Sequence, residues 1–178
     1  MVLRNYFSEF KPFLLFLARF LFVYILLTVC YFYFLEFYSN NIDAITANVA
    51  FLTQKIAVFF GLDLQVLNNF FEFKIIYKNK FVARIVEGCN AVSLLILFVS
   101  FVIGFTGSLQ KSLIFIFFGC FLVYLVNVFR IILLVVLLYY YPKLEHILHG
   151  VVFPLVIYSL VFLLCIVWVN KFSNYASK

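Results

Sequence analysis

Residues 113–138 read LIFIFFGCFLVYLVNVFRIILLVVLL, an apolar run that contains one amide, Asn127, and one charge, Arg130. At about 1.5 Å per residue, this run is long enough to cross a hydrocarbon core of about 30 Å. Arg130 would then lie roughly 26 Å from the start of the run, near the far side of the membrane. A charge inside a membrane segment is costly, so its presence favours a functional role.

The composition of the whole chain agrees with a membrane protein. Hydrophobic residues make up 67% of the 178 residues and charged residues only 11%, which excludes an ordinary soluble domain. The 27 Phe and 12 Tyr suit lipid-facing helices and aromatic belts at the membrane surface. The net charge of +6 is spread along the chain, so it indicates attraction to a lipid bilayer rather than nucleic-acid binding.

Four apolar stretches predict an all-α polytopic membrane protein with a single membrane domain. The predicted transmembrane helices are residues 13–37, 87–106, 113–141 and 151–169. The second stretch is short if it starts at Ala91, and it reaches spanning length only when residues 86–90 are included.

The segment between the first two spans, residues 42–86, is expected outside the membrane. Residues 42–62 mix polar side chains with apolar ones, which indicates an amphipathic helix at the interface. A fifth span is the alternative for this stretch. Residues 71–81 alternate in polarity around Lys78-Asn79-Lys80, a pattern that predicts a small exposed β-hairpin.

Loop charges predict the orientation. With four spans, both termini lie on one side of the membrane. The short segments on that side carry one acid, Glu9, and six basic residues: Arg4, Lys11, Arg19, Lys111, Lys171 and Lys178. Six basic residues on the opposite side are diluted in a long loop and matched by acids. The positive-inside rule therefore places both termini in the cytoplasm of a multi-pass protein of the cytoplasmic membrane. The first apolar run is too long for a cleaved signal peptide.

The four cysteines fall into two classes. Cys30, Cys120 and Cys165 lie inside apolar runs, where a cysteine usually behaves as a small hydrophobe. Cys89 lies in the stretch EGCNAVS, residues 87–93, directly before a span, and Gly88 allows a tight turn there. If Cys89 begins the helix, the helix N-terminus would favour its thiolate, and free backbone N–H groups would hold an oxyanion.

Three further polar residues accompany Cys89: Asn127, Arg130 and His149. Asn127 and Arg130 share one helical face, so Asn127 would hold a guanidinium aimed into the bundle. The alternative is that Arg130 snorkels to the interface as an anchor. His149 directly precedes the last span and is preferred over His146 as a general base for Cys89.

A metal site remains an alternative for the two histidines and Glu145, which share a helical face, but a third strong ligand is missing. The spacing of the cysteines is not that of a zinc site. No metal and no cofactor is therefore predicted. Cys89, Arg130 and His149 are all expected at one depth, at the outer side of the membrane.

These motifs, in this order, resemble the core of the exosortase/archaeosortase family: EGCNAVS before a span, Asn127-x-x-Arg130-Ile131, and a histidine before the last span. The resemblance covers roughly residues 81–170. The short length and the Phe- and Tyr-rich last span are most similar to the exosortase F type of flavobacteria. Ala91 stands where many members carry Gly, and most members are longer, with more spans.

The resemblance implies a cysteine transpeptidase or protease, with the family's Cys, Arg and His at Cys89, Arg130 and His149. Its substrates would be exported proteins whose C-terminal tail has a short motif, a membrane helix and a basic end. Cys89 would form a thioester, and water or an amine on a cell-envelope acceptor would resolve it. Supporting or substrate-binding residues near the entrance would be Arg84, Glu87, Asn90 and Asn127.

Two other classes of function remain open. One is a different cysteine-dependent membrane enzyme, such as an acyltransferase that moves a lipid chain. The other is a non-enzymatic membrane component of an export or assembly complex.

Overall fold

A computed structural model describes residues 2–38, 41–69, 72–105 and 107–172, with side chains from residue 10 onward. Phe71 of the predicted hairpin, Thr106 at the end of the predicted second span, and Lys178 lie outside the described residues. The long elements are α1 (Val2–Phe37), α2 (Ala44–Phe59), β1 (Leu64–Asn69), β2 (Glu72–Tyr77), β3 (Lys80–Ile85), α3 (Val92–Gly104), α4 (Leu109–Tyr140) and α6 (Phe153–Lys171). The short elements are η1 (Glu87–Cys89), η2 (Pro142–Leu144), α5 (Glu145–Ile147) and η3 (Leu148–Val152).

The chain is a helical polytopic membrane protein, which confirms the predicted fold class. Within the described residues, three helical stretches are long and apolar enough to cross a membrane: Phe10–Phe37, Leu109–Tyr140 and Pro142–Lys171. The helix α3 has 13 residues and is therefore only about 20 Å long. Among the described residues of the predicted second span, 87–105, only Val92–Gly104 are α-helical.

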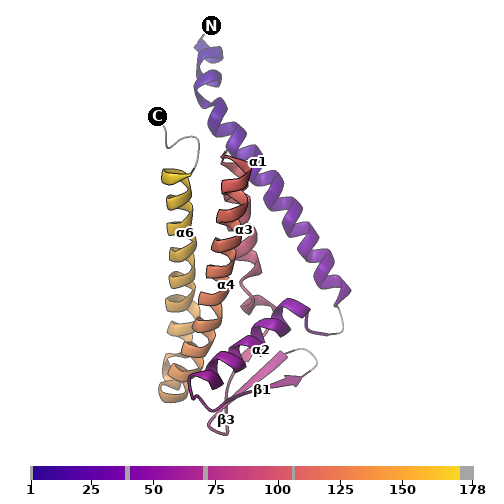
Figure 1. The fold of residues 1–178 in the computed structure, drawn as a ribbon, viewed down its shortest axis with the longest axis vertical. Coiled ribbons are helices and arrows are strands. Elements are labelled where there is room, and N and C mark those ends of the chain that lie inside the picture. Colours follow the sequence, from indigo (N-terminus) through magenta and orange to yellow (C-terminus); the bar gives the residue numbers. More distant parts are fainter. Residues whose placement is uncertain (1, 39–40, 70–71, 106, 173–178) are drawn as a thin grey trace.

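The short helix α3 lies at the centre of the bundle and packs against α1, α4 and α6. Figure 1 shows the N-terminal end of α1 and the C-terminal end of α6 at one end of the molecule, with α2 and the strands at the other. A close approach joins α3 to α4, because a methyl group at Gly119 would overlap the buried ring of Phe98. This contact leaves no room for a larger side chain at Gly119.

The strands form an antiparallel sheet in the order β1-β2-β3. The predicted hairpin is β2 and β3, and Lys78 and Asn79 form its turn with positive φ angles of 48° and 59°. The strand β1 adds a third member that the alternation of residues 71–81 did not predict. Lys78 Nζ donates a hydrogen bond to Tyr140 Oη over 3.2 Å, which raises the pKa of Lys78 and ties the turn to the end of α4.

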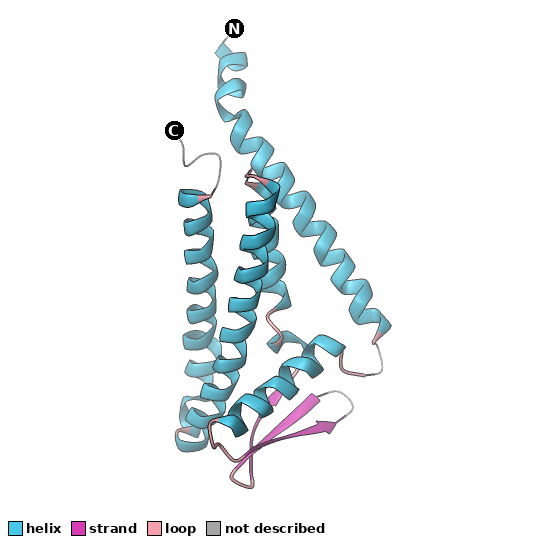
Figure 2. Cartoon of the chain, viewed as in Figure 1, coloured by secondary structure: helices cyan, strands magenta, loops and turns pink. Residues whose placement is uncertain are grey.

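The helix α2 covers one face of this sheet, as Figure 2 shows. The apolar face of α2 packs with the sheet and with α4 in one core, which contains Val49, Ala50, Ala57, Leu64, Ile75, Ile85, Val128, Ile131 and Val135. The opposite face of α2 carries exposed residues such as Phe51 and Val58. The sheet and α2 therefore form a cap on one end of the helical bundle.

The fold predicts which basic residues share a side of the membrane. Lys74 on β2 and Lys143 in η2 belong to the capped end, whereas Lys111 lies in the first turn of α4 at the opposite end. In a variant with all four native cysteines changed to Ala, Lys74→Cys and Lys143→Cys should react with an impermeant maleimide in intact cells. Lys111→Cys should react only after permeabilisation. External labelling at residue 111 would reverse the predicted orientation.

Candidate functional site

The turn that carries Cys89 joins β3 to α3. Cys89 ends the 3-10 turn Glu87–Cys89, and its backbone N–H donates to the carbonyl of Val86 over 2.8 Å. Ala91 follows in the left-handed conformation, with φ of 60°, and α3 begins only at Val92. The expectation that Cys89 itself begins the helix is therefore wrong, because the left-handed residue separates the turn from the helix.

Ala91 adopts a left-handed conformation that favours glycine, the residue that the family resemblance leads us to expect at this position. Glycine adopts positive φ angles without a Cβ penalty, whereas alanine does so at a cost. The turn keeps its shape in this chain because neighbouring side chains hold it from both sides.

Asn90 is the first of the side chains that hold this turn, and it is nearly completely buried. Its Nδ2 donates to Tyr31 Oη (2.8 Å) and to Thr46 Oγ1 (3.0 Å), while its Oδ1 accepts from the backbone N–H of Val92 (3.0 Å). Asn90 therefore joins the turn to α1 and α2 and also satisfies a free N–H at the start of α3.

Behind Asn90 lies a buried carboxylate. Asp43 accepts hydrogen bonds from the backbone N–H groups of Ile45 and Thr46 at the N-terminus of α2, both over 2.9 Å. Its Oδ2 also accepts from Thr46 Oγ1 over 2.5 Å. Because Thr46 in turn accepts from Asn90, the cap of α2 and the Cys89 turn form one hydrogen-bonded network.

Asn127 on α4 is the second side chain that holds the Cys89 turn. Its Nδ2 donates to the backbone carbonyl of Cys89 over 2.8 Å, and the side chain is fully buried. The expectation that Asn127 holds Arg130 is wrong, because Asn127 Oδ1 and Arg130 Nε both have no hydrogen-bond partner among the described residues. Asn127 instead fixes the backbone of Cys89 one helical turn away from Arg130.

Cys89, Arg130 and His149 line one cavity of about 400 Å³. The first turn of α3 contributes Val92, Ser93 and Leu94 to its wall, and α6 contributes Pro154, Ile157 and Tyr158. Arg130 is partly buried at this cavity, and its Nε has no hydrogen-bond partner among the described residues. The structure thus brings together the three side chains that the sequence placed at one depth.

The two histidines have different surroundings. His149 lies in the π-helical turn Leu148–Val152 and borders both the Cys89 cavity and a neighbouring cavity of about 410 Å³. His146 lines only the neighbouring cavity, together with Lys143 and Glu145. Among the described residues, no three His, Cys, Asp or Glu side chains are grouped so that they would hold a metal ion.

Of the other predicted site residues, Asn90 lines the cavity, whereas Arg84 and Glu87 do not. Arg84 on β3 is exposed and forms an ion pair with Glu72 Oε2 over 3.4 Å. Glu87 is exposed in the 3-10 turn, and neither residue lines the Cys89 cavity. Pro154, Ile157 and Tyr158 also line the cavity, and the sequence motifs did not point to them. Their spacing of three and four residues indicates one face of a helix.

A family model described as transmembrane exosortase matches residues 7–167, which is most of the chain. The chain belongs to the transmembrane exosortase family. Comparisons with curated proteins and with solved structures found no match. Exosortases are membrane cysteine peptidases or transpeptidases that process the C-terminal sorting signals of exported proteins. The predicted family is confirmed, whereas the F type stays a prediction because the match covers the family as a whole.

The left-handed conformation of Ala91 should make the thermal stability of this exosortase sensitive to the side chain at residue 91. Ala91→Gly removes the Cβ penalty of about 1 kcal/mol and should raise the melting temperature of the detergent-solubilised protein. Ala91→Val places a β-branched side chain at positive φ and should lower it. Thermal unfolding of both variants measures the effect. A melting temperature that falls in Ala91→Gly would contradict the conformation assigned to this turn.

Proposed function

We propose that this exosortase is a sortase-like cysteine transpeptidase or peptidase whose active site faces the outside of the cytoplasmic membrane. The observation that carries the proposal is that Cys89, Arg130 and His149, from three separate elements, line one cavity. A thiol, an imidazole and a guanidinium around one cavity provide the nucleophile, base and anion stabiliser of an acyl transfer.

In the proposed reaction, His149 accepts the thiol proton of Cys89 and Sγ attacks the carbonyl carbon of the scissile peptide bond. The tetrahedral intermediate collapses, the C–N bond breaks, and the leaving amine takes the proton from His149. The acyl group then remains on Sγ as a thioester. Water or an amine on a cell-envelope acceptor attacks this thioester and gives its proton to His149. The C–S bond then breaks, and His149 returns the proton to Sγ of Cys89.

Arg130 supplies the positive charge in this scheme. Arg130 lines the same cavity as Cys89, and its Nε is buried without a hydrogen-bond partner among the described residues, which supports a role in stabilising the thiolate and the oxyanion that forms beside it. The first turn of α3 borders the same cavity. The positive end of the helix dipole there would also stabilise the negative charge of the thiolate and the oxyanion. Asn127 keeps the Cys89 backbone at a fixed position relative to Arg130.

The proposed substrates are exported proteins whose C-terminal tail has a short motif, a membrane helix and a basic end. Trapping the intermediate tests the reaction class. A thioester between Cys89 and a protein tail supports the proposal, whereas a fatty-acyl thioester would indicate an acyltransferase. Absence of any adduct would favour a non-enzymatic role.

The nucleophile is tested with an exported, epitope-tagged reporter that ends in the C-terminal tail of a protein from the same cell, chosen because its processing requires this chain. Cys89→Ala should reduce processing by at least about a thousandfold while the protein still accumulates, because no other thiol reaches the cavity. Cys30→Ala and Cys120→Ala are the controls and should retain activity. Normal processing by Cys89→Ala would exclude the cysteine mechanism.

The base is tested with a pair of histidine variants. His149→Ala should reduce the processing rate by about 10²–10⁴-fold, the usual contribution of a general base. His146→Ala should retain substantial activity because His146 does not line the Cys89 cavity. Immunoblots of the reporter over time give both rates. An active His149→Ala with an inactive His146→Ala would assign the base to His146.

The role of Arg130 is tested by Arg130→Lys, which keeps the charge and loses the planar fork. If the guanidinium contacts the oxyanion, the reporter should be processed about 10²–10³-fold more slowly, as after loss of an oxyanion-hole donor. If Arg130 only anchors α4 at the interface, Lys should replace it with little change in rate, because Lys also snorkels. The same reporter assay separates these outcomes.

A further inference from the structure

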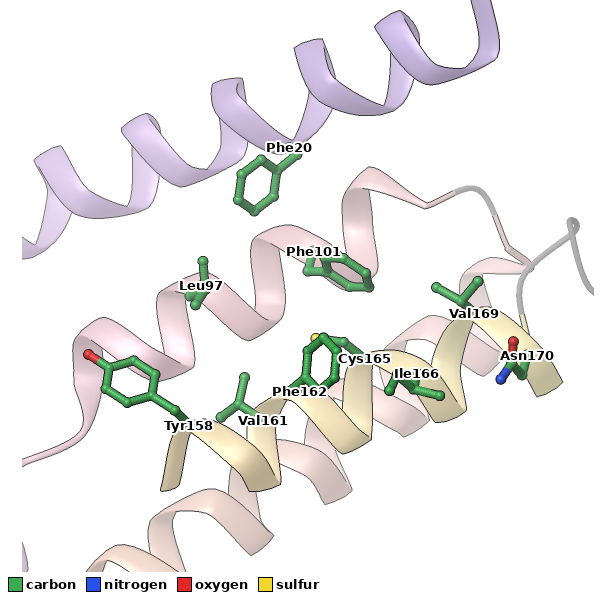
Figure 3. A pocket seen from close by; sticks show the side chains of 10 residues that line it. All are labelled: Phe20, Leu97, Phe101, Tyr158, Val161, Phe162, Cys165, Ile166, Val169 and Asn170. Atoms are coloured by element: carbon green, nitrogen blue, oxygen red, sulfur yellow. The ribbon is translucent and has the colours of Figure 1, made fainter. Parts of the chain in front are cut away.

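A second cavity, of about 510 Å³, lies in the membrane part of the bundle. The helices α1 and α6 both pack against α3, and between them they leave a groove whose walls are almost entirely apolar. Figure 3 shows Phe20 of α1 and Phe101 of α3 facing Phe162 and Ile166 of α6 across this space. The proposed chemistry at Cys89 uses none of these side chains.

The groove adjoins the Cys89 cavity, because Tyr158 lines both. From that residue the lining follows one face of α6 toward the opposite end of the bundle, at spacings of three and four residues. The residues of α6 along this joint path are Pro154, Ile157, Tyr158, Val161, Phe162, Cys165, Ile166, Val169 and Asn170. Residues 154–170 span about 24 Å, which is most of the thickness of a hydrocarbon core.

A ligand that fills both cavities would be long and apolar along α6, with one end at Cys89. We propose that the groove binds the transmembrane helix of the substrate's tail and so holds the peptide bond outside that helix at Cys89; this proposal rests on the proposed function. A peptide that leaves the Cys89 cavity and enters the membrane has to be helical, because lipid satisfies no backbone hydrogen bonds.

The shape of the groove suits such a helix. Val161 and Cys165, both nearly buried, form a floor of small side chains, while Phe162 and Ile166 are exposed walls. Side chains of an approaching helix pack onto such a floor by van der Waals contact, which is the main force between helices in lipid. Tyr158 and Phe162 are 58% and 66% exposed, so the groove is open to a helix that arrives sideways through the bilayer.

Crosslinking tests the occupant directly. A photoreactive phenylalanine analogue at Phe162, which faces the groove, should crosslink to the tagged reporter in a Cys89→Ala background that preserves the precursor. The matched control is Leu163, which is similarly exposed on α6 but does not line the groove. Crosslinking of the reporter from residue 162 and not from 163 supports the proposal. Equal crosslinking from both positions, or lipid adducts alone at residue 162, would overturn it.

Filling the groove gives a second test. Ile166→Trp should slow processing of the reporter by about tenfold or more. The larger side chain would fill part of the groove and so weaken the binding of the substrate's tail helix. Val167→Trp is the matched control, since Val167 is 37% and Ile166 39% exposed, and only Ile166 lines the groove. With the other three cysteines changed to Ala, alkylation of Cys89 by a small maleimide should proceed equally in both variants, which shows that the Cys89 cavity is intact.

The two proposals fail in different ways. Processing that continues in Cys89→Ala removes the proposed function. Processing that needs Cys89 but is equally fast in Ile166→Trp and Val167→Trp leaves the proposed function and excludes the groove as the binding site for the tail helix.

Discussion

The hydrogen bond from Asn127 to the carbonyl of Cys89 is the interaction on which the site depends. It crosses the interior of an apolar bundle, where a lost partner leaves a buried polar group unpaired at a cost of about 1–3 kcal/mol. The bond fixes the Cys89 turn to α4, the helix that also carries Arg130. Thiol and guanidinium are therefore positioned by one helix, although 40 residues of sequence separate them.

Asn90 holds the same turn from the other side, through Tyr31 on α1 and Thr46 on α2. These bonds stabilise a conformation that alanine adopts only at a cost, the left-handed Ala91. The cap formed by α2 and the three strands thereby has a function in addition to covering the bundle. It supplies the buried Asp43–Thr46 pair against which the Cys89 turn is held.

The bundle presents two kinds of surface around α6. Toward one end, Pro154, Ile157 and Tyr158 border a cavity with a thiol, a guanidinium and an imidazole. Farther along α6, its residues line the apolar groove. Residues of α3 and α1 form the rest of this groove. Polar chemistry at the end of the spans and an apolar groove within them fit the proposed substrate, a protein tail anchored in the membrane.

The sequence by itself determined the helical membrane fold and the hairpin turn at Lys78 and Asn79, because apolar run length and alternating polarity are local patterns. It also predicted one depth for Cys89, Arg130 and His149, which line one cavity in the structure. Only the tertiary structure decided that α3 starts after Cys89, that Asn127 binds Cys89 rather than Arg130, that β1 joins the sheet, and that Arg84 pairs with Glu72 away from the cavity. These features depend on contacts between residues far apart in the chain, and no local pattern in the sequence encodes them.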